Sequence, residues 1–354
     1  MSKVTFNNKG NLFFVTVKQK VDSYFKENNI SPSGSFKLYH KAIVLYAIAV
    51  ASYVTLVFFT PTILVSIALC IILGLAFASI GFNVMHDGAH GSYSNKEWIN
   101  KLMAFSLNIM GGSAFMWKIK HNIVHHTFTN IDEVDDDIDI KPWMRVSKTQ
   151  PLKWFHRFQH VYWVALYGIM YIFWVYYLDF QKYFSGKIGD TKVAKMTIKE
   201  HIVFWLSKVV YTFFIIVLPI IKVGLVETII GYLVMATVCG IVISTVFQLA
   251  HVVENVDFPL PDEKTNKIEN EWAVHQVLTT ANFATKNKIV SWFVGGLNFQ
   301  IEHHLFPRIS HIHYPQISRF VKETCEQFNV RYNEFPTVLS AIRSHIQQLK
   351  LSGV

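Results

Sequence analysis

The stretch AIVLYAIAVASYVTLVFFTPTILVSIALCIILGLAFASIGFNVM, residues 42–85, decides the fold of this chain. It contains no Asp, Glu, Lys, Arg or His, and Pro61 divides it into runs of about 42–60 and 61–85. Each run has roughly the 20 apolar residues that cross a bilayer as an α-helix. Because proline is favoured in the first turn of a helix, the stretch predicts two membrane spans joined by a tight turn.

A second pair of apolar runs, about 202–221 and 224–250, predicts another hairpin of the same kind. Lys208 is the one basic residue inside these two runs. It lies near the end of its span that we expect to face the cytoplasm. A lysine at such a position can extend its ammonium group to the membrane surface, so we keep the span.

The distribution of lysine predicts the orientation of both hairpins. Lysines are frequent before residue 42 and across 96–199, whereas residues 42–95 contain none. Loops rich in Lys and Arg stay on the cytoplasmic side of a membrane. The N-terminus is therefore predicted to be cytoplasmic, and residues 86–201 and 251–354 are predicted to form a cytoplasmic helical cap.

The composition excludes several classes of protein. Of the 354 residues 51% are hydrophobic and only 16% are charged, with a mean hydropathy of +0.28, whereas a soluble domain has about 25% charged residues. The three cysteines show no paired or metal-binding spacing, which argues against a disulfide scaffold. A net charge of +9 in so apolar a chain indicates basic cytoplasmic loops, and we expect no nucleic-acid partner.

A third apolar stretch, Val161–Leu178, is a rival membrane span. If it crossed, the second hairpin would be inverted, and the histidines after residue 250 would be separated from those at 86–126. Its many Trp and Tyr side chains suit a helix at the membrane interface instead. We therefore predict an all-α integral membrane protein with four transmembrane helices in two hairpins, in which residues 1–41 form a cytoplasmic N-terminal segment and residues 42–354 the membrane domain.

Histidines cluster where the predicted spans emerge. Two imidazoles at i and i+4 lie on one face of a helix, one turn apart, which is a spacing that suits one metal ion. The candidate ligands are His86, His90, His121, His125, His126, His251, His303 and His304. So many imidazoles exceed the needs of a zinc site, and nitrogen-rich ligation of two ions favours a dinuclear iron site, although ligand type alone also admits zinc or manganese.

Further polar and aromatic residues near these histidines have two possible roles each. Metal-bound histidines usually donate their second N–H to a carboxylate, so we expect partners among Asp87, Glu302, Asp135, Asp136 and Asp137, unless the acidic run is only a solvated loop. Four further residues could line a substrate channel: Trp117, Asn282, Trp292 and Asn298. Alternatively, the tryptophans serve only in aromatic packing and the asparagines only cap turns.

Three motifs carry a resemblance to a known family. HDGAH at 86–90, HNIVHH at 121–126 and QIEHH at 300–304 resemble the three histidine boxes of membrane fatty acid desaturases. Gln300, which opens the third box, resembles the front-end subgroup, of the linoleoyl-CoA or delta-6 type. Many members of that subgroup carry a fused cytochrome b5 domain with an HPGG motif. This sequence has no HPGG, and 41 residues before the first span leave no room for that domain.

The resemblance implies a reaction and its cofactors. It implies O2-dependent insertion of a cis double bond into a fatty acyl chain, supplied as acyl-CoA or acyl-lipid. It also implies two iron ions, Fe2+ or Fe3+, held by the boxes and His251, with Gln300 as a direct ligand, a ligand through water or an orienting residue. We predict no catalytic side chain beyond these ligands.

An external reductant is expected, because the sequence holds no haem, flavin or cysteine-cluster motif. A ferredoxin or a cytochrome b5 would fit, steered by basic residues near the first two boxes: Lys96, Lys101, Lys118, Lys120, Lys141 and Arg145. Two other readings stay open. One is a histidine-box hydroxylase or monooxygenase acting on an acyl, alkane or carotenoid substrate, and the other is a non-enzymatic membrane metal sensor or transporter.

Overall fold

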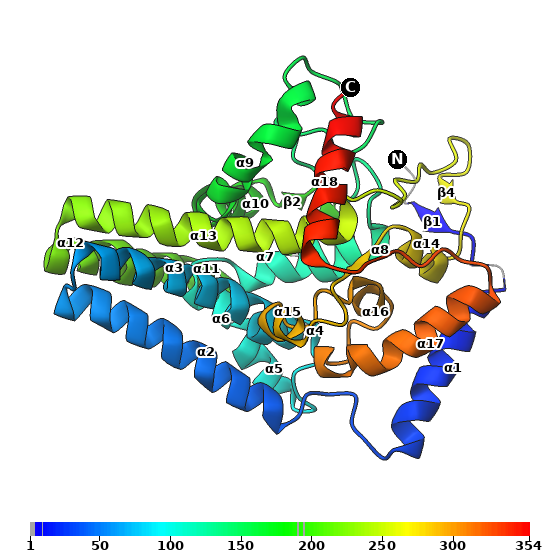
Figure 1. Ribbon diagram of the computed structural model, residues 1–354, viewed down its shortest axis with the longest axis horizontal. Coiled ribbons are helices and arrows are strands. Elements are labelled where there is room, and N and C mark those ends of the chain that lie inside the picture. The colour runs from blue at the N-terminus through cyan, green and yellow to red at the C-terminus, as the bar shows by residue number, and fades with distance from the viewer. Residues whose placement is uncertain (1–3, 9, 190, 194) are drawn as a thin grey trace. The chain divides into compact units, whose positions relative to one another are not determined.

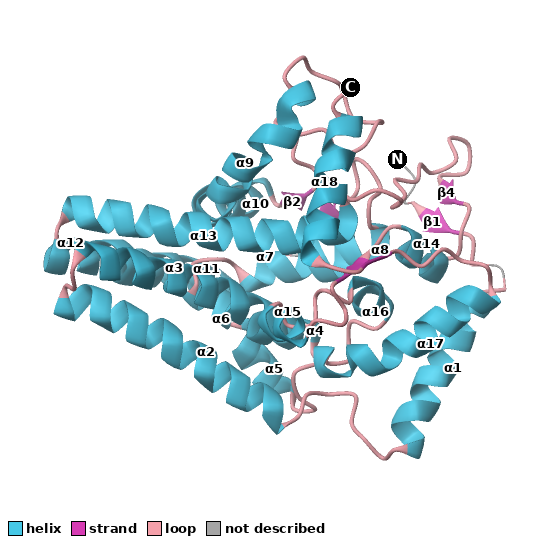
Figure 2. Cartoon of the chain, in the orientation of Figure 1, coloured by secondary structure: helices cyan, strands magenta, loops and turns pink. Residues whose placement is uncertain are grey.

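The computed structural model describes residues 4–8, 10–189, 191–193 and 195–354. The chain is mostly helical, as predicted, and its few strands are two residues long (Figure 2). It divides into two compact units that interleave along the sequence. Unit 1 comprises Met1–Gly34, Lys120–Tyr162 and Val246–Val354, and unit 2 comprises Ser35–Ile119 and Trp163–Thr245.

Unit 2 is built around long apolar helices (Figure 1). They are α2 (Phe36–Val54) with η1 (Thr55–Phe59), α3 (Ile63–Ile80) with η2 (Gly81–Met85) and α4 (His86–His90), α11 (Ile198–Thr212) with η6 (Phe213–Val217) and α12 (Leu218–Val223), and most of α13 (Leu225–His251). Thr60 and Gly224 separate consecutive helices with φ values of 41° and 110°. Both chain reversals therefore fall where the sequence predicts a tight turn.

Within the described residues, five helices are long and apolar enough to cross a membrane, one more than the predicted spans. They are Phe36–Phe59, Ile63–His90, His156–Ser185, Ile198–Val223 and Leu225–His251. Each of the four predicted spans corresponds to one of these helices, and the rival stretch Val161–Leu178 lies in the fifth. Helices of this length and composition are those of a membrane protein.

Lys208 corrects one expectation about these helices. Its ammonium group does not extend to a surface, because the side chain is buried and ion-paired with Asp179 at 2.7 Å. It also donates hydrogen bonds to the carbonyls of Gly111 at 2.5 Å and Val175 at 2.7 Å. Acceptors from two other segments of unit 2 therefore compensate the charge, and snorkelling is not needed.

Shorter helices complete unit 2: α5 (Glu97–Ala104), α6 (Ser106–Ile109), α7 (Ala114–Lys118), most of α9 (Gln159–Phe173), η5 (Trp174–Leu178) and α10 (Asp179–Ser185), followed by the β2–β3 hairpin (Lys187–Ile188 and Thr191–Lys192). Gly88 lets α5 pack closely on α4. A Cβ atom at Gly88 would lie 2.6 Å from the backbone nitrogen of Ala104 and 2.6 Å from the Cβ of Met103. The glycine inside HDGAH thus has a packing role.

Unit 1 contains the remaining helices: α1 (Leu12–Glu27), most of η3 (Ile119–His125), α8 (His126–Phe128), η4 (His156–Phe158), α14 (Trp272–Leu278), α15 (Lys288–Phe293), α16 (Gln300–Leu305), η7 (His311–His313), α17 (Tyr314–Gln327) and α18 (Val338–Ser352). Two parallel strand pairs join distant parts of the chain. β1 (Thr5–Phe6) pairs with β4 (Lys267–Ile268), and β5 (Asn282–Phe283) pairs with β6 (Glu334–Phe335).

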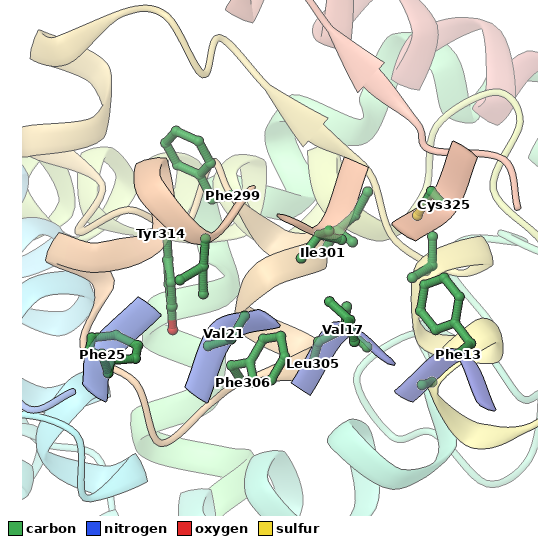
Figure 3. Close-up of a cluster of buried hydrophobic side chains, with 14 residues drawn as sticks. Phe13, Val17, Val21, Phe25, Phe299, Ile301, Leu305, Phe306, Tyr314 and Cys325 are labelled. Atoms are coloured by element: carbon green, nitrogen blue, oxygen red, sulfur yellow. The ribbon is translucent and has the colours of Figure 1, made fainter. Parts of the chain in front are cut away.

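The core of unit 1 includes the N-terminal helix. Figure 3 shows Phe13, Val17, Val21 and Phe25 along α1, at every fourth position, beneath apolar side chains of α16, α17 and their neighbours. Burying each such side chain contributes about 1.5–3 kcal/mol. The N-terminal segment is therefore part of the core that holds α16.

Candidate metal centre

Six of the eight candidate histidines meet inside unit 1. They come from η3 and α8, from the last residue of α13, and from α16. His125, His251 and His304 form one group, in which one ligand nitrogen of each lies within 4.8 Å of the others. Their ring centroids are 4.7–4.9 Å apart. Segments far apart in the sequence thus bring three imidazoles to one point.

The other three histidines of unit 1 continue this cluster. The ring of His126 lies 4.4 Å from that of His304 and 4.6 Å from that of His303, measured between centroids. The Nε2 atoms of His126 and His121 are 3.2 Å apart. The rings of His121 and His303 stack at 6.0 Å. Six imidazoles therefore form one continuous buried array.

Asp135 orients His125 through the Nδ1 side of its ring. The Nδ1 of His125 lies 3.0 Å and 3.1 Å from the two carboxylate oxygens of Asp135. The same carboxylate accepts the backbone N–H groups of Asn130 at 2.9 Å and Asp137 at 3.0 Å. Four polar contacts thus hold one buried carboxylate in place, and the Nε2 of His125 is left facing the cluster of imidazoles.

Asp137 stands behind His121 and also binds Lys120. Its carboxylate lies 3.5 Å from the Nδ1 of His121 and 2.5 Å from the ammonium of Lys120, which is also 3.7 Å from Asp136. Burial opposes ionisation of Asp137, but Lys120 and the neighbouring histidines hold the pKa of this carboxyl well below its usual range. Burial lowers the pKa of His121 to about 4, so the ring is neutral at pH 7, which is the form that binds a metal.

Three further partners were missed by sequence reasoning. The Nδ1 of His304 lies 2.8 Å from the side-chain oxygen of Gln276, and that of His251 lies 3.4 Å from the carbonyl of Thr279. The Nδ1 of His303 lies 3.1 Å from the hydroxyl of Tyr314. None of these partners is a carboxylate beside a histidine box, so the search for acidic neighbours could not find them.

The array fits a metal centre. The Nε2 atoms of His125 and His251 are buried and have no hydrogen-bond partner within the described part of the chain. A buried polar atom left in that state costs about 1–3 kcal/mol. Their Nδ1 atoms already have acceptors, so each Nε2 carries the lone pair. In their neutral form, imidazoles arranged in this way are ligands for divalent transition metals.

Unit 2 carries the remaining candidate pair, His86 and His90, in α4. The i, i+4 spacing places the two buried rings side by side, with centroids 4.7 Å apart. Trp117 meets both rings edge-on at 5.6 Å and 6.0 Å. Asp87, between the two histidines, is also fully buried. Trp117 therefore forms an aromatic wall beside this pair.

The third box holds two other predicted residues. Gln300 is buried and begins α16. Glu302 is also buried, and its carboxylate accepts hydrogen bonds from the amide of Asn282 at 2.7 Å and the hydroxyl of Tyr332 at 2.8 Å. Burial raises the pKa of Glu302 to about 7. The contact with Asn282 joins α16 to β5, and the contact with Tyr332 joins α16 to the segment before β6.

The other channel candidates, Asn298 and Trp292, differ in their contacts and exposure. The amide of Asn298 donates to the hydroxyl of Ser291 at 3.0 Å and to the carbonyl of Ala284 at 3.3 Å, which is the turn-stabilising alternative. Trp292, on α15, is 46% exposed. Trp117, as described above, contacts two of the candidate ligands.

Among the basic residues proposed to steer an electron donor, Arg145 needs a correction. Arg145 is almost fully buried, and its guanidinium donates to the carbonyls of Lys148, Gln150, Ser352 and Val354. It therefore anchors the C-terminal helix. Three of the lysines form ion pairs within the chain: Lys120 with Asp137, Lys101 with Glu97, and Lys141 with Asp132.

Comparison with known proteins adds a family. Residues 61–336 match the family described as fatty acid desaturase. The chain is 39% identical over 346 residues to an acyl-lipid (8-3)-desaturase of Physcomitrium patens, covering 97% of this chain and 72% of that protein. It is 36% identical over 339 residues to an sn-1 linoleoyl-lipid 6-desaturase of Synechocystis, covering 95% and 94%. A protein of the same description from Arthrospira platensis is 35% identical over 355 residues, covering 100% and 95%.

Proposed function

The chain belongs to the fatty acid desaturase family, and from that premise we propose that it inserts a cis double bond into an acyl chain carried by a membrane lipid. The observation that carries the proposal is the buried array of six imidazoles in unit 1, because that array can hold metal ions. The relatives described as lipid desaturases support a lipid-linked substrate over acyl-CoA.

We propose that the metal ions are two irons. Their ligands would be the six histidines of unit 1 with His86 and His90, and Gln300 would complete the set directly, through water or by orienting a neighbour. When bound, iron cycling between Fe2+ and Fe3+ supplies the reduction of O2 that breaking an unactivated C–H bond requires. The nitrogen-rich donor set supports iron, since hard magnesium or calcium ions prefer oxygen ligands.

The protein's own contribution begins with the tautomers of its histidines. Asp135, Gln276 and the carbonyl of Thr279 accept from the Nδ1–H groups of His125, His304 and His251. Each contact keeps the proton on Nδ1 and leaves Nε2 as the ligand atom. The rings are therefore oriented before any ion binds.

Exclusion of water is the second contribution. Beside His86 and His90, Trp117 and Trp174 pack against a buried apolar cluster that includes Met85 and Leu107. Apolar walls keep water from a strong oxidant and confine a hydrocarbon chain. We propose that the acyl chain passes along the Trp117 side of this pair.

The topology proposed from the sequence completes this picture. Four spans would cross the bilayer in two hairpins, the stretch Val161–Leu178 would lie at the interface, and the reaction would take place on the cytoplasmic face of the 42–354 membrane domain. The lysine distribution supports this orientation. Because O2 takes four electrons and the substrate supplies two, a reductant such as a ferredoxin or a cytochrome b5 must dock on that face.

Lipid analysis of a host expressing the gene tests the function. We expect a new double bond, located by mass spectrometry, between an existing one and the carboxyl end of the acyl chain. His125→Ala should abolish it and lower bound iron, whereas His40→Ala, an exposed residue outside the clusters, should change neither. A hydroxylated product would instead establish the monooxygenase alternative, and an unchanged lipid profile would contradict both.

A further inference from the structure

A cleft of about 950 Å³ opens in unit 1, between α1 and the segment that follows α16. Its apolar lining comes from both sides, with Phe14 and Phe25 from α1 and Leu305 and Phe306 from the end of the third histidine box. Figure 3 shows Phe25 on α1, and Leu305 and Phe306 between Val21 and Val17 of the same helix. The volume is that of a small-molecule site.

The walls of this cleft are fixed. The backbone N–H of Ser310 donates to the carbonyl of Pro32 at 2.9 Å, which joins the loop after α1 to the segment after α16. The ring of His313 meets Phe25 edge-on at 5.1 Å between centroids. Since α1 is also anchored through its buried side chains, the cleft is preformed.

The rim of the cleft is basic. Lys26 from α1 and Arg308 from the segment after α16 line it, both are exposed, and neither forms an ion pair with any described residue. Lys18 also lines the cleft but is paired with Asp22. One uncompensated cation therefore stands on each wall, above an apolar lining.

One wall of the cleft directly follows the third histidine box in the sequence. His303 and His304 lie in α16, and the next residues, Leu305 and Phe306, line the cleft. A ligand held there would therefore sit next to the third histidine box. An anionic headgroup at the rim, with its hydrocarbon directed along the apolar lining, matches both the charge and the position of the cleft.

We propose that this cleft binds the phosphate-bearing headgroup of a glycerophospholipid whose acyl chain is the substrate. This inference rests on the proposed function and makes it more specific. The phosphodiester would lie between Lys26 and Arg308, and the glycerol would lie against Phe25 and Phe306. Coenzyme A carries several phosphate groups, and two uncompensated cations suit the single phosphodiester of a bilayer lipid better.

A binding measurement tests the cleft independently of catalysis. Phosphatidylglycerol with a photoactivatable headgroup is cross-linked to metal-free, detergent-solubilised protein, and the labelled peptides are identified by mass spectrometry. We expect labels in α1 and in residues 305–309. Cross-linking should fall about tenfold for Lys26→Gln and for Arg308→Gln, and further for the double variant. Lys350→Gln, an exposed lysine on α18, serves as the matched control and should label like the wild type.

A kinetic measurement in nanodiscs gives the second readout. The double variant should raise KM for phosphatidylglycerol while leaving kcat and the turnover of neutral galactolipid close to wild type. Equal losses in Lys350→Gln would show general surface attraction and overturn the proposal, as would unchanged labelling in the double variant. Displacement of the probe by acyl-CoA at equal concentration would assign the cleft to coenzyme A instead. If the enzyme desaturates no lipid while the probe still labels the cleft, the proposed function fails and the binding site stands.

Discussion

At the scale of single residues, five of the six imidazoles of the array contact a partner outside it. His304 shows this most clearly, because the side-chain oxygen of Gln276 accepts from its Nδ1 at 2.8 Å and also accepts from Thr129 at 2.9 Å. An uncharged amide can therefore orient a histidine ring, a role that the sequence analysis assigned to acidic residues. Asp135 does play that part for His125.

Gln276→Leu tests this role at nearly constant volume. The substitution removes the acceptor for His304, and loss of such an outer partner lowers metal affinity by about 10–100-fold. We expect less iron per chain after dialysis against a chelator, with an unchanged circular dichroism spectrum. Gln347→Leu, at an exposed position on α18, is the control. Full retention of iron by Gln276→Leu would show that the contact does not matter for binding.

His345 gives a pH dependence to stability. It is fully buried, its Nδ1 lies 2.6 Å from the carbonyl of Val252, and burial lowers its pKa from 6.5 to about 4. The unfolded chain therefore takes up a proton at a higher pH than the folded one. Stability is complete above pH 6.5 and falls as the pH drops toward 4, by up to about 3 kcal/mol from this group.

His345→Asn keeps a side-chain N–H but removes the titration. We expect Tm of the detergent-solubilised variant to fall less steeply between pH 6.5 and pH 4 than that of the wild type. His121 and His275 have pKa values that burial lowers to about 4 as well, so some slope will remain. Identical slopes for variant and wild type would contradict the assignment to His345.

At the scale of elements, several long helices contain a π-helical turn, and two of these turns adjoin the histidines. η2 (Gly81–Met85) runs directly into α4, and η3 (Ile119–His125) carries His121 and His125. A π-turn shifts the faces of a helix relative to the regular 3.6-residue period and is frequent at functional sites. The i, i+4 spacing still predicts that the rings are neighbours, but the register of the turn depends on packing.

The contact between α11 and α10 makes a second testable element. Lys208→Met leaves the Asp179 carboxylate buried without its cation, which should cost about 3–5 kcal/mol. The double variant with Asp179→Leu removes both charges and should recover most of the loss in Tm. Lys222→Met, an exposed residue beside Phe58, is the control. A double variant as unstable as Lys208→Met would mean that the ion pair itself is not the source of the stability.

At the scale of the whole molecule, the crossing of the bilayer is the central prediction. Single cysteines are introduced at Ser31, Ser185 and Lys222, which are all exposed, and labelled with an impermeant maleimide on intact cells. We expect Lys222→Cys to react from outside, and the other two to react only after permeabilisation. The native cysteines are buried and should stay silent. Labelling of Ser185→Cys from outside would show that the helix His156–Ser185 crosses.

The sequence by itself determined what depends on local pattern. Apolar runs of span length predict the long helices, Pro61 and Gly224 mark where they turn, and the spacing in HDGAH places His86 and His90 side by side. These features follow from a few consecutive residues, because hydrophobic length and helical periodicity act over one or two turns. The three histidine boxes could be recognised from the sequence for the same reason, because each consists of a few consecutive residues.

Only the tertiary structure decided the contacts between distant segments. Lys208 forms an ion pair with Asp179, His304 hydrogen-bonds to Gln276, and Arg145 donates to carbonyls at the end of α18. Each contact spans a sequence gap that no local pattern encodes. The N-terminal helix likewise became part of the core around α16 through side chains whose partners lie beyond residue 270. Buried polar and apolar groups accept whichever complementary partner the packed chain presents, so these choices emerge only when the chain is folded.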